Sequence, residues 1–204
     1  MRIECTSAYP TGQVAYRGVG SLLHNLLDSW QIVQKAPDPL IIALGDSTTA
    51  GTPAFTSPLE APPNGAGNAE SQYAYWLMKT HPDWQVLNRG VNGERSDQIR
   101  ARFARDVIAE RRNGRPPCLV VIIAGVNDIY QGRTAEAIEG ELEGMYDAAR
   151  AAAIPVVAGT IIPYNTAADA ENRRMHPSPD GYRLMALALE AAIKRALAAA
   201  HPLR

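Results

Sequence analysis

The chain has 204 residues, of which 46% are hydrophobic and 20% charged, and its formal net charge is −1. This length predicts one main domain, and the composition is that of an ordinary globular protein rather than a disordered or membrane-embedded one. Because the charges are nearly balanced, we expect no nucleic acid and no membrane as a partner.

Residues 1–38 precede the first predicted core strand, and we expect them to form an extension packed on or beside the main domain, residues 39–204. Within it, "GQVAYR" is compatible with a short strand, and "SLLHNLLDSWQIV" places four leucines and Trp30 on one helical face. The segment lacks the apolar core of a signal peptide, and no run in the chain approaches the roughly 18 apolar residues of a membrane helix. The expected location is therefore cytoplasmic.

Four short apolar runs predict the strands of a parallel sheet. They are rich in Val and Ile and continuous rather than alternating, as in strands covered on both faces. In chain order they are "PLIIALGDS" (39–47), "WQVLNRG" (84–90), "CLVVIIAGVND" (118–128) and "IPVVAGTIIP" (154–163). Cys118 opens the third run and is expected to be a small buried hydrophobe, because two distant cysteines make neither a disulfide framework nor a zinc pattern.

Helical patterns lie between the strands and begin after Ser96, after Thr134 and at Pro179. The apolar face expected for the last helix consists of Leu184, Leu187 and Ala191. The arginine-rich stretch 100–115 is interpreted as a solvated helix face. The alternation of strands and helices indicates a doubly wound, three-layer α/β/α domain, in which the strand C-terminal ends share the edge where ligands bind.

The residues expected at this edge have the chemistry of acyl transfer. They are Ser47, Gly90, Asn127 and His176. A serine hydroxyl needs a base, histidine can serve as that base, and backbone N–H groups with an Asn amide suit the oxyanion of a tetrahedral intermediate. The other histidines, which lie away from the predicted edge, are interpreted as surface or capping residues: His24, His81 and His201.

With these residues in place, the sequence resembles the SGNH, or GDSL, family of serine ester hydrolases. The family's blocks match "GDSTTAGTP", "NRGVNGE", "GVND" and "HPSPDGY", in this order. The resemblance implies a flavodoxin-like fold and no metal or organic cofactor. It also implies that Ser47 is the nucleophile, that His176 is the base, and that the oxyanion hole consists of the N–H groups of Ser47 and Gly90 and the side chain of Asn127.

The chain departs from the family in front of the last block. Arg173 stands three residues before His176, where the family has its catalytic Asp, and the short stretch 166–175 replaces a helix and a strand. We therefore expect four clear strands, with the usual fifth either missing or replaced by the N-terminal segment. Asp169 or Glu171 can take the place of the Asp, a backbone carbonyl can hold the His176 ring in a Ser–His dyad, or the protein is nearly inactive; these alternatives stay open.

The leading hypothesis is a hydrolase of small or short-chain carboxylic esters, with a small-molecule ester as its partner. Candidates for an apolar acyl wall come from the loop 51–68 and from the helix after it: Phe55, Leu59, Tyr73, Tyr75 and Trp76. Residues such as the last three more often pack the helix that follows the loop. The alternative is a catalytically impaired binding protein of the same fold. Nucleotide binding at "GDSTTAG" is disfavoured, because the loop lacks the P-loop lysine and the dinucleotide-binding glycine spacing. The oligomeric state stays open, and a dimer is one possibility.

Overall fold

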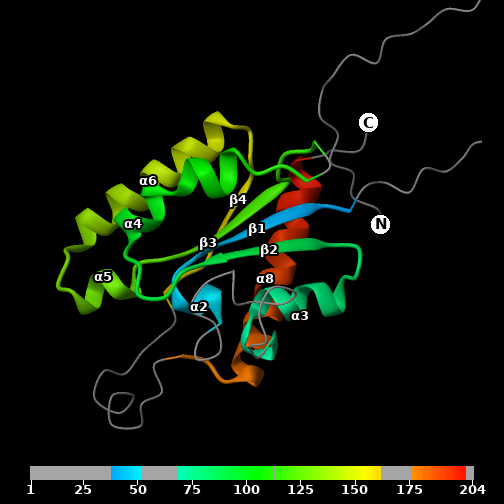
Figure 1. The fold of residues 1–204 in the computed structure, drawn as a ribbon, viewed down its shortest axis with the longest axis horizontal. Coiled ribbons are helices and arrows are strands. Elements are labelled where there is room, and N and C mark those ends of the chain that lie inside the picture. Colours follow the sequence, from blue (N-terminus) through cyan, green and yellow to red (C-terminus); the bar gives the residue numbers. More distant parts are fainter. Residues whose placement is uncertain (1–37, 52–68, 113, 162–175, 201–204) are drawn as a thin grey trace, which may run out of the picture.

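The computed structural model describes residues 38–51, 69–112, 114–161 and 176–200. Their centre is a parallel four-stranded sheet with the strand order β2-β1-β3-β4 (Figure 1). The strands are β1 Leu40–Gly45, β2 Gln85–Gly90, β3 Leu119–Ile123 and β4 Val156–Ala158. The predicted runs thus form parallel strands, each shorter than its run.

The register of the strands aligns their C-terminal ends. Gly45 at the end of β1 lies beside Gly90 at the end of β2 and beside Ile123 at the end of β3. The segments that follow these three strands therefore leave the sheet at one edge, and the site described below forms there.

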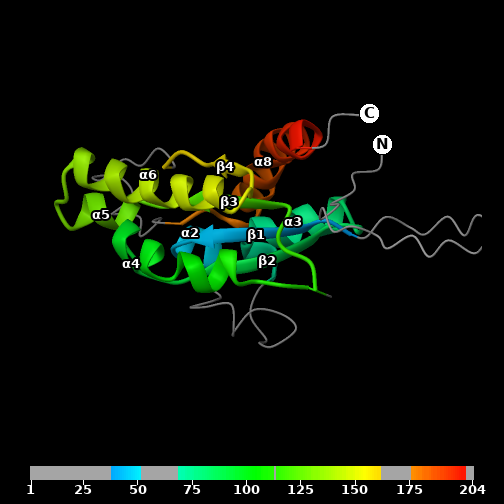
Figure 2. The same cartoon turned by 90° about the horizontal axis from the view of Figure 1, so that it is seen from above.

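Helices cover both faces of the sheet, as the three-layer prediction requires (Figure 2). One face carries α3 (Tyr73–Thr80), preceded by the turn η1 (Ala69–Ser71), and α8 (Pro179–Ala200). The other carries α4 (Ser96–Ala101), a π-helical turn η2 (Ala104–Ile108) and α6 (Ala135–Ala151). Two short helices follow β1 and β3 directly, α2 (Ser47–Ala50) and α5 (Val126–Tyr130).

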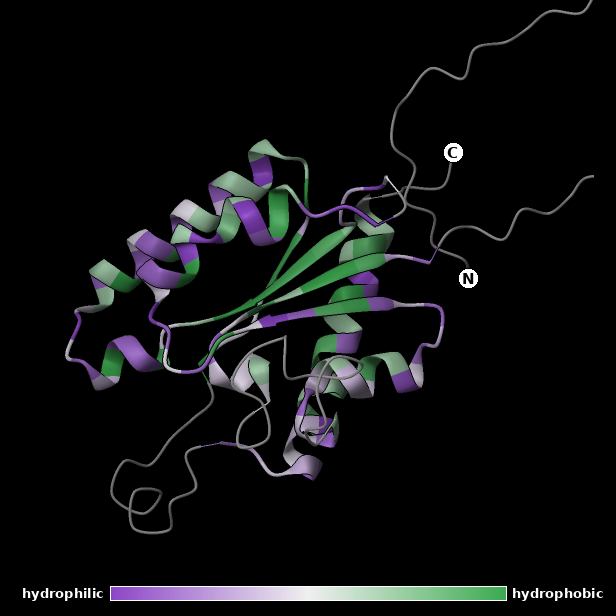
Figure 3. Ribbon diagram, in the orientation of Figure 1, coloured by the Kyte–Doolittle hydropathy of each residue, from purple (hydrophilic) through white to green (hydrophobic). Residues whose placement is uncertain are grey.

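The hydrophobic core has two layers because successive side chains of a strand point to opposite faces. Ile41 and Ala43 of β1 belong to the layer under α3 and α8, whereas Leu40, Ile42 and Leu44 belong to the layer under α4 and α6. β1 and β3 are accordingly the most continuously hydrophobic parts of the ribbon, whereas the end of β2 is hydrophilic (Figure 3). Within the described ranges, no helix has the length and apolar character needed to cross a membrane.

The predicted apolar face of α8 is wrong. Leu184 and Leu187 are 61% and 51% exposed, and Ala191 is also exposed. The helix packs on the sheet through another stripe, which consists of Tyr182, Ala186, Leu189, Ile193 and Leu197. This Ala- and Leu-rich helix has apolar residues on all of its sides, so hydrophobic periodicity alone does not indicate which side is buried.

Two further expectations change. Arg102, from the stretch interpreted as solvated, is buried at 7% exposure. Cys118 is partly buried against the core and disulfide-bonded, rather than a free thiol. The other cysteine of the sequence, Cys5, lies outside the described residues, as do "GQVAYR", the leucine-rich helix pattern and two of the other histidines, His24 and His201.

Candidate active site

Ser47 occupies the first position of α2, directly after the turn that ends β1. Asp46 caps this helix: its Oδ1 accepts a hydrogen bond from the Thr48 N–H at 2.9 Å. Gly51 ends the helix in the left-handed conformation, φ 95°, and donates its N–H to the Ser47 carbonyl. The cap and the glycine confine α2 to one turn, which places the serine at the C-terminal edge of the sheet.

His176 reaches Ser47 from the other end of the chain. Its Nε2 lies 2.8 Å from Ser47 Oγ. Burial lowers the pKa of His176 from its ordinary value of 6.5, because a half-buried ring is less easily charged. A neutral imidazole at this distance can accept the serine proton, so the geometry fits a nucleophile and its base.

Asp46 is fully buried next to the nucleophile. Burial, with a smaller contribution from the negative charge of Asp128, raises its pKa to about 6 against the opposing hydrogen bonds from Thr48. Its Oδ2 has no hydrogen-bond partner among the described residues. The carboxylate therefore holds the turn of Ser47 through one oxygen and carries a desolvation cost on the other.

The Gly90 N–H, which the family resemblance implies as an oxyanion donor, makes a hydrogen bond within the protein. This N–H donates to Asn88 Oδ1 at 2.9 Å, and Asn88 Nδ2 in turn donates to the Thr49 carbonyl at 2.8 Å. A Cβ on Gly90 would lie 2.0 Å from the backbone nitrogen of Ala50. The glycine at this position allows β2 to pack against the nucleophile helix, and its N–H is already engaged.

Asn127 lies in the first turn of α5 and is connected to the loop that follows β2. Its Nδ2 donates to the Glu94 carbonyl at 2.8 Å. The preceding residue of that loop, Gly93, has φ +77°, and nothing lies within 4 Å of the place where a Cβ would stand. No hydrogen bond of the described residues uses its N–H. Sequence reasoning missed Gly93, although the Asn-Gly dipeptide that contains it is a strong turn signal.

A fully buried carboxylate fixes the start of α5 relative to α4. Asp128 accepts hydrogen bonds from the N–H and the hydroxyl of Ser96, both at 2.7 Å, and from Arg133 at 3.1 Å. The sequence predicts that this helix begins after Ser96, but Ser96 is the first residue of α4, and Asp128 supplies the capping acceptor from another segment. Because Asp128 follows Asn127 directly, these bonds also restrict where the Asn127 amide lies.

The third member of a triad is not among the described groups. No described carboxylate contacts the His176 ring, and burial is the cause of its pKa shift. The candidates Asp169 and Glu171 lie outside the described residues, as do Phe55 and Leu59 of the expected acyl wall. Tyr73 is part of the core. The rings of Tyr75 and Trp76 pack edge to face with their centroids 5.4 Å apart, and the Lys79 ammonium lies over the Trp76 ring.

The part of the chain that the structure describes contains no group of three or more His, Cys, Asp or Glu side chains that could hold a metal ion. The remaining histidine of this part, His81, stacks on Trp84 and hydrogen-bonds Glu190 at 2.9 Å. It lies near the end of α3, away from Ser47, and takes no part in the site.

The fold and the site together define a class: a three-layer α/β protein with a serine–histidine pair at the C-terminal edge of a parallel sheet. The model of the GDSL-like lipase/acylhydrolase family matches residues 43–177, more than half of the chain. The chain therefore belongs to this family, which identifies it as an enzyme acting on esters or acyl groups.

Solved structures share the fold at low sequence identity. The psychrotrophic esterase EstA from Pseudoalteromonas sp. is 16% identical with a TM-score of 0.56, over 78% of this chain and 98% of that one. A G-D-S-L family protein from Desulfitobacterium hafniense is 21% identical with a TM-score of 0.53, over 72% and 95%. AlinE4, an SGNH-hydrolase family esterase, is 18% identical with a TM-score of 0.50, over 78% and 97%. No curated protein sequence matches the chain.

Proposed function

We propose that the protein hydrolyses small or short-chain carboxylic esters through an acyl-enzyme on Ser47. The observation that carries this proposal is the 2.8 Å contact between Ser47 Oγ and His176 Nε2 at the edge where the other motif segments meet. The substrate is a small-molecule ester.

In the proposed reaction, His176 takes the proton of the Ser47 hydroxyl as the oxygen attacks the ester carbonyl. The tetrahedral intermediate collapses when the protonated ring gives its proton to the leaving alcohol. Water then attacks the acyl-enzyme by the same route, and the acid and free Ser47 are released. The ring nitrogen that faces the serine is thus used twice in each half-reaction.

The oxyanion needs donors aimed at the position where its charge develops. We assign this role to the Ser47 N–H and the Asn127 amide, together with the Gly93 N–H in place of the Gly90 N–H. Two facts support Gly93: the space around it is open, and Asn127 is bonded to the carbonyl of the next residue. Each lost donor costs roughly 10²–10³ in kcat in enzymes of this kind.

The second candidate function is a binding protein that has lost turnover. The observation in its favour is that no described carboxylate supports the His176 ring. Spoiling the acid of a triad costs about 10⁴ in kcat, but an oxyanion hole with substrate binding alone retains about 10³ over water. A Ser–His dyad with intact oxyanion donors therefore supports slow hydrolysis rather than none.

The hydrolysis of p-nitrophenyl acetate separates the two functions. We compare the wild-type protein with Ser47→Ala and His176→Ala, and use urea unfolding to show that the variants are folded. The esterase proposal predicts that each substitution lowers kcat at least about 100-fold, the contribution of general base catalysis. Equal rates in the three proteins would leave the binding protein as the better account.

The cytoplasmic location expected from the N-terminal sequence stays a prediction.

A further inference from the structure

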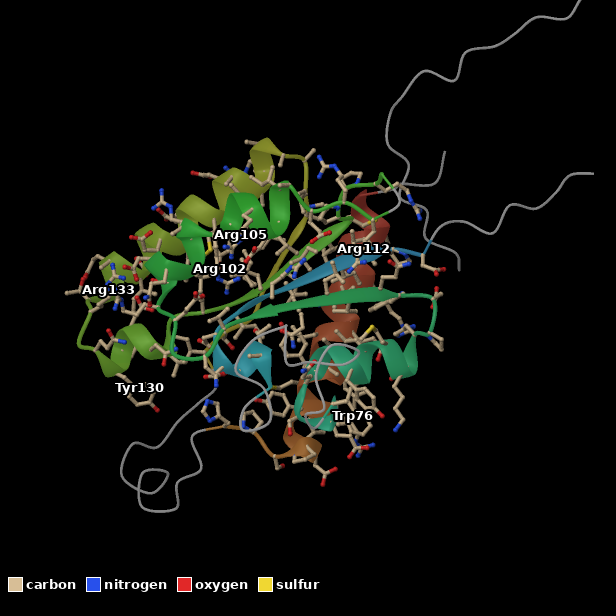
Figure 4. All side chains as sticks on the ribbon, in the orientation of Figure 1. Trp76, Arg102, Arg105, Arg112, Tyr130 and Arg133 are labelled. Atoms are coloured by element: carbon tan, nitrogen blue, oxygen red, sulfur yellow. The ribbon has the colours of Figure 1, made fainter. Side chains whose placement is uncertain are left out.

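Arg102 is an unusual residue in the helix layer behind the site. It is only 7% exposed and lies between α4 and the sheet, at the point where α4 ends and the π-helical turn η2 begins (Figure 4). A buried charge is expensive unless it is paired and hydrogen-bonded. The contacts that compensate this charge therefore show what holds the side chain in place.

The guanidinium of Arg102 bonds three separate segments. Nε donates to Glu94 Oε2 at 2.6 Å, Nη1 donates to Asp106 Oδ2 at 2.6 Å, and Nη2 donates to the Gly45 carbonyl at 2.9 Å. The planar, rigid fork of arginine suits three simultaneous bonds, which the point charge of a lysine does not replace. These segments are the loop after β2, the η2 turn and the end of β1.

Two of the three segments are connected to residues of the proposed site. The Gly45 carbonyl lies two residues before Ser47, and it also accepts the Val91 N–H at 3.1 Å at the start of the loop after β2. The Glu94 carbonyl accepts the Asn127 amide, so the residue bound by Arg102 through its side chain binds Asn127 through its backbone. The Arg102 guanidinium thus links the base of the nucleophile turn to the loop that holds the oxyanion amide.

The neighbouring Arg105 provides a natural contrast. It also donates to Asp106, at 2.6 and 3.1 Å, but its side chain is 74% exposed. No hydrogen bond described for it reaches Glu94 or Gly45, and it interacts with Glu94 only through its charge. An effect that depends only on positive charge near Asp106 would appear at both arginines, whereas a positioning effect would appear at Arg102 alone.

We propose that Arg102 is a positioning residue for the oxyanion hole, fixing the Glu94 loop and the Asn127 amide relative to Ser47. This inference rests on the proposed esterase function and adds to it a residue that touches neither substrate nor reacting atoms. A misplacement of about 1 Å in such a site can cost 100-fold in rate. The loss falls on kcat, because the oxyanion forms only after the substrate has bound.

The test compares Arg102→Lys and Glu94→Ala with the matched control Arg105→Met in the full chain. Arg102→Lys keeps the charge and loses the fork, and Glu94→Ala removes the same link from the other side while leaving the backbone carbonyl for Asn127. With p-nitrophenyl acetate, kcat falls about 10- to 100-fold in the first two variants. KM changes far less than kcat, and Arg105→Met behaves as the wild type.

A merely structural role gives a different pattern. In that case Arg102→Lys and Glu94→Ala lower the urea midpoint but leave kcat unchanged in the folded protein, and this result overturns the proposal. A fall in kcat of the same size in Arg105→Met also overturns it. If Arg102→Lys does not fold, Glu94→Ala decides alone, because it leaves Arg102 paired with Asp106.

Hydrogen exchange keeps this test separate from the esterase proposal. Even if the wild type does not hydrolyse the ester, the proposal predicts faster amide exchange in residues 91–95 of Arg102→Lys and Glu94→Ala, with unchanged exchange in Arg105→Met. Unchanged protection of that loop in both variants would overturn the role of Arg102, whatever the outcome for Ser47.

Discussion

The Ser47 hydroxyl and the His176 ring lie 2.8 Å apart, although the two residues are 129 positions apart in the chain. The two ends of this contact are held differently. Ser47 lies on a helix turn capped by Asp46, whereas no described carboxylate contacts the His176 ring. The chemistry of the site therefore depends on how the imidazole behaves with little electrostatic support.

The pH dependence of catalysis follows from the burial of His176. The base must be neutral, and burial holds its pKa below 6.5 because the charged form is desolvated. The acid limb of kcat/KM for p-nitrophenyl acetate should thus have its midpoint below pH 6.5. A midpoint above 6.5 would contradict this and would indicate a negative charge that stabilises the imidazolium.

The two candidate carboxylates for a triad are tested one at a time. If Asp169 or Glu171 holds the ring, Asp169→Asn or Glu171→Gln lowers kcat at least tenfold, because the ring then loses its orientation and the support of its charge. The check is kcat at a pH well above the acid limb, where the base is fully neutral. If both variants keep kcat within tenfold of the wild type, the protein works as a Ser–His dyad.

The stability of the protein should depend on Asp46. Its pKa is raised from 3.8 to about 6, so between these pH values the folded state holds a proton that the unfolded state has lost. Stability then falls as pH rises from about 4 to above 6, by a total on the order of 3 kcal/mol. Asp46→Asn keeps the acceptor for Thr48 and removes the charge. The difference between its urea midpoint and that of the wild type therefore increases in favour of the variant as pH rises.

Urea unfolding at pH 4.5 and 7.5 checks this prediction. The advantage of Asp46→Asn over the wild type should be larger at the higher pH. The same difference at both pH values would mean that Asp46 does not titrate in this range. The variant also separates two groups in the rate profile: the acid limb should remain in Asp46→Asn if it belongs to His176.

Two glycines in the loop region should respond to alanine for different reasons and to different degrees. Gly90→Ala places a Cβ 2.0 Å from the backbone nitrogen of Ala50, so the nucleophile helix or β2 has to move. Overpacking of this kind costs about 1–3 kcal/mol, and we expect kcat to fall with it. In Gly93→Ala the new Cβ meets open space and the N–H is kept, so the variant loses only the roughly 1–2 kcal/mol of stability that a left-handed alanine costs.

Urea unfolding and kcat measured on both variants test this contrast. Gly90→Ala should be the more damaging to activity at equal loss of stability. A Gly90→Ala protein with wild-type kcat, beside an inactive Gly93→Ala, would contradict the packing account of the two positions.

The arrangement of the fold was accessible from the sequence because buried parallel strands leave continuous apolar runs. The runs before Ser47, after Trp84 and after Cys118 predict β1, β2 and β3, and the shared edge then follows from parallel pairing. Ser47, Asn127 and His176 could be chosen for the same reason, since each stands at the end of a strand or the start of the last helix. The contact between Ser47 and His176 confirms that two of these positions meet.

The features of the site that could not be predicted from the sequence depend mostly on contacts between distant segments. The burial of Arg102 is set by the packing of α4 on β1, which leaves no periodic mark in the sequence. The Gly90 N–H is engaged locally instead, by the side chain of Asn88 two residues before it. The prediction of the buried face of α8 is wrong for another reason. Leu184 and Leu187 are the larger apolar residues of the stripe that the sequence favours, but Tyr182 and Ile193, on another side of the helix, are buried. Size and spacing did not decide between two apolar stripes.

The central claim is that Ser47 is a nucleophile activated by His176, and covalent labelling tests it most directly. The protein is treated with a fluorophosphonate, and the adduct is located by mass spectrometry in the wild type, Ser47→Ala and His176→Ala. We predict one adduct on Ser47, no adduct in Ser47→Ala, and labelling slowed at least about 100-fold in His176→Ala. A folded wild-type protein without an adduct on Ser47, or one labelled equally fast without His176, would contradict the account.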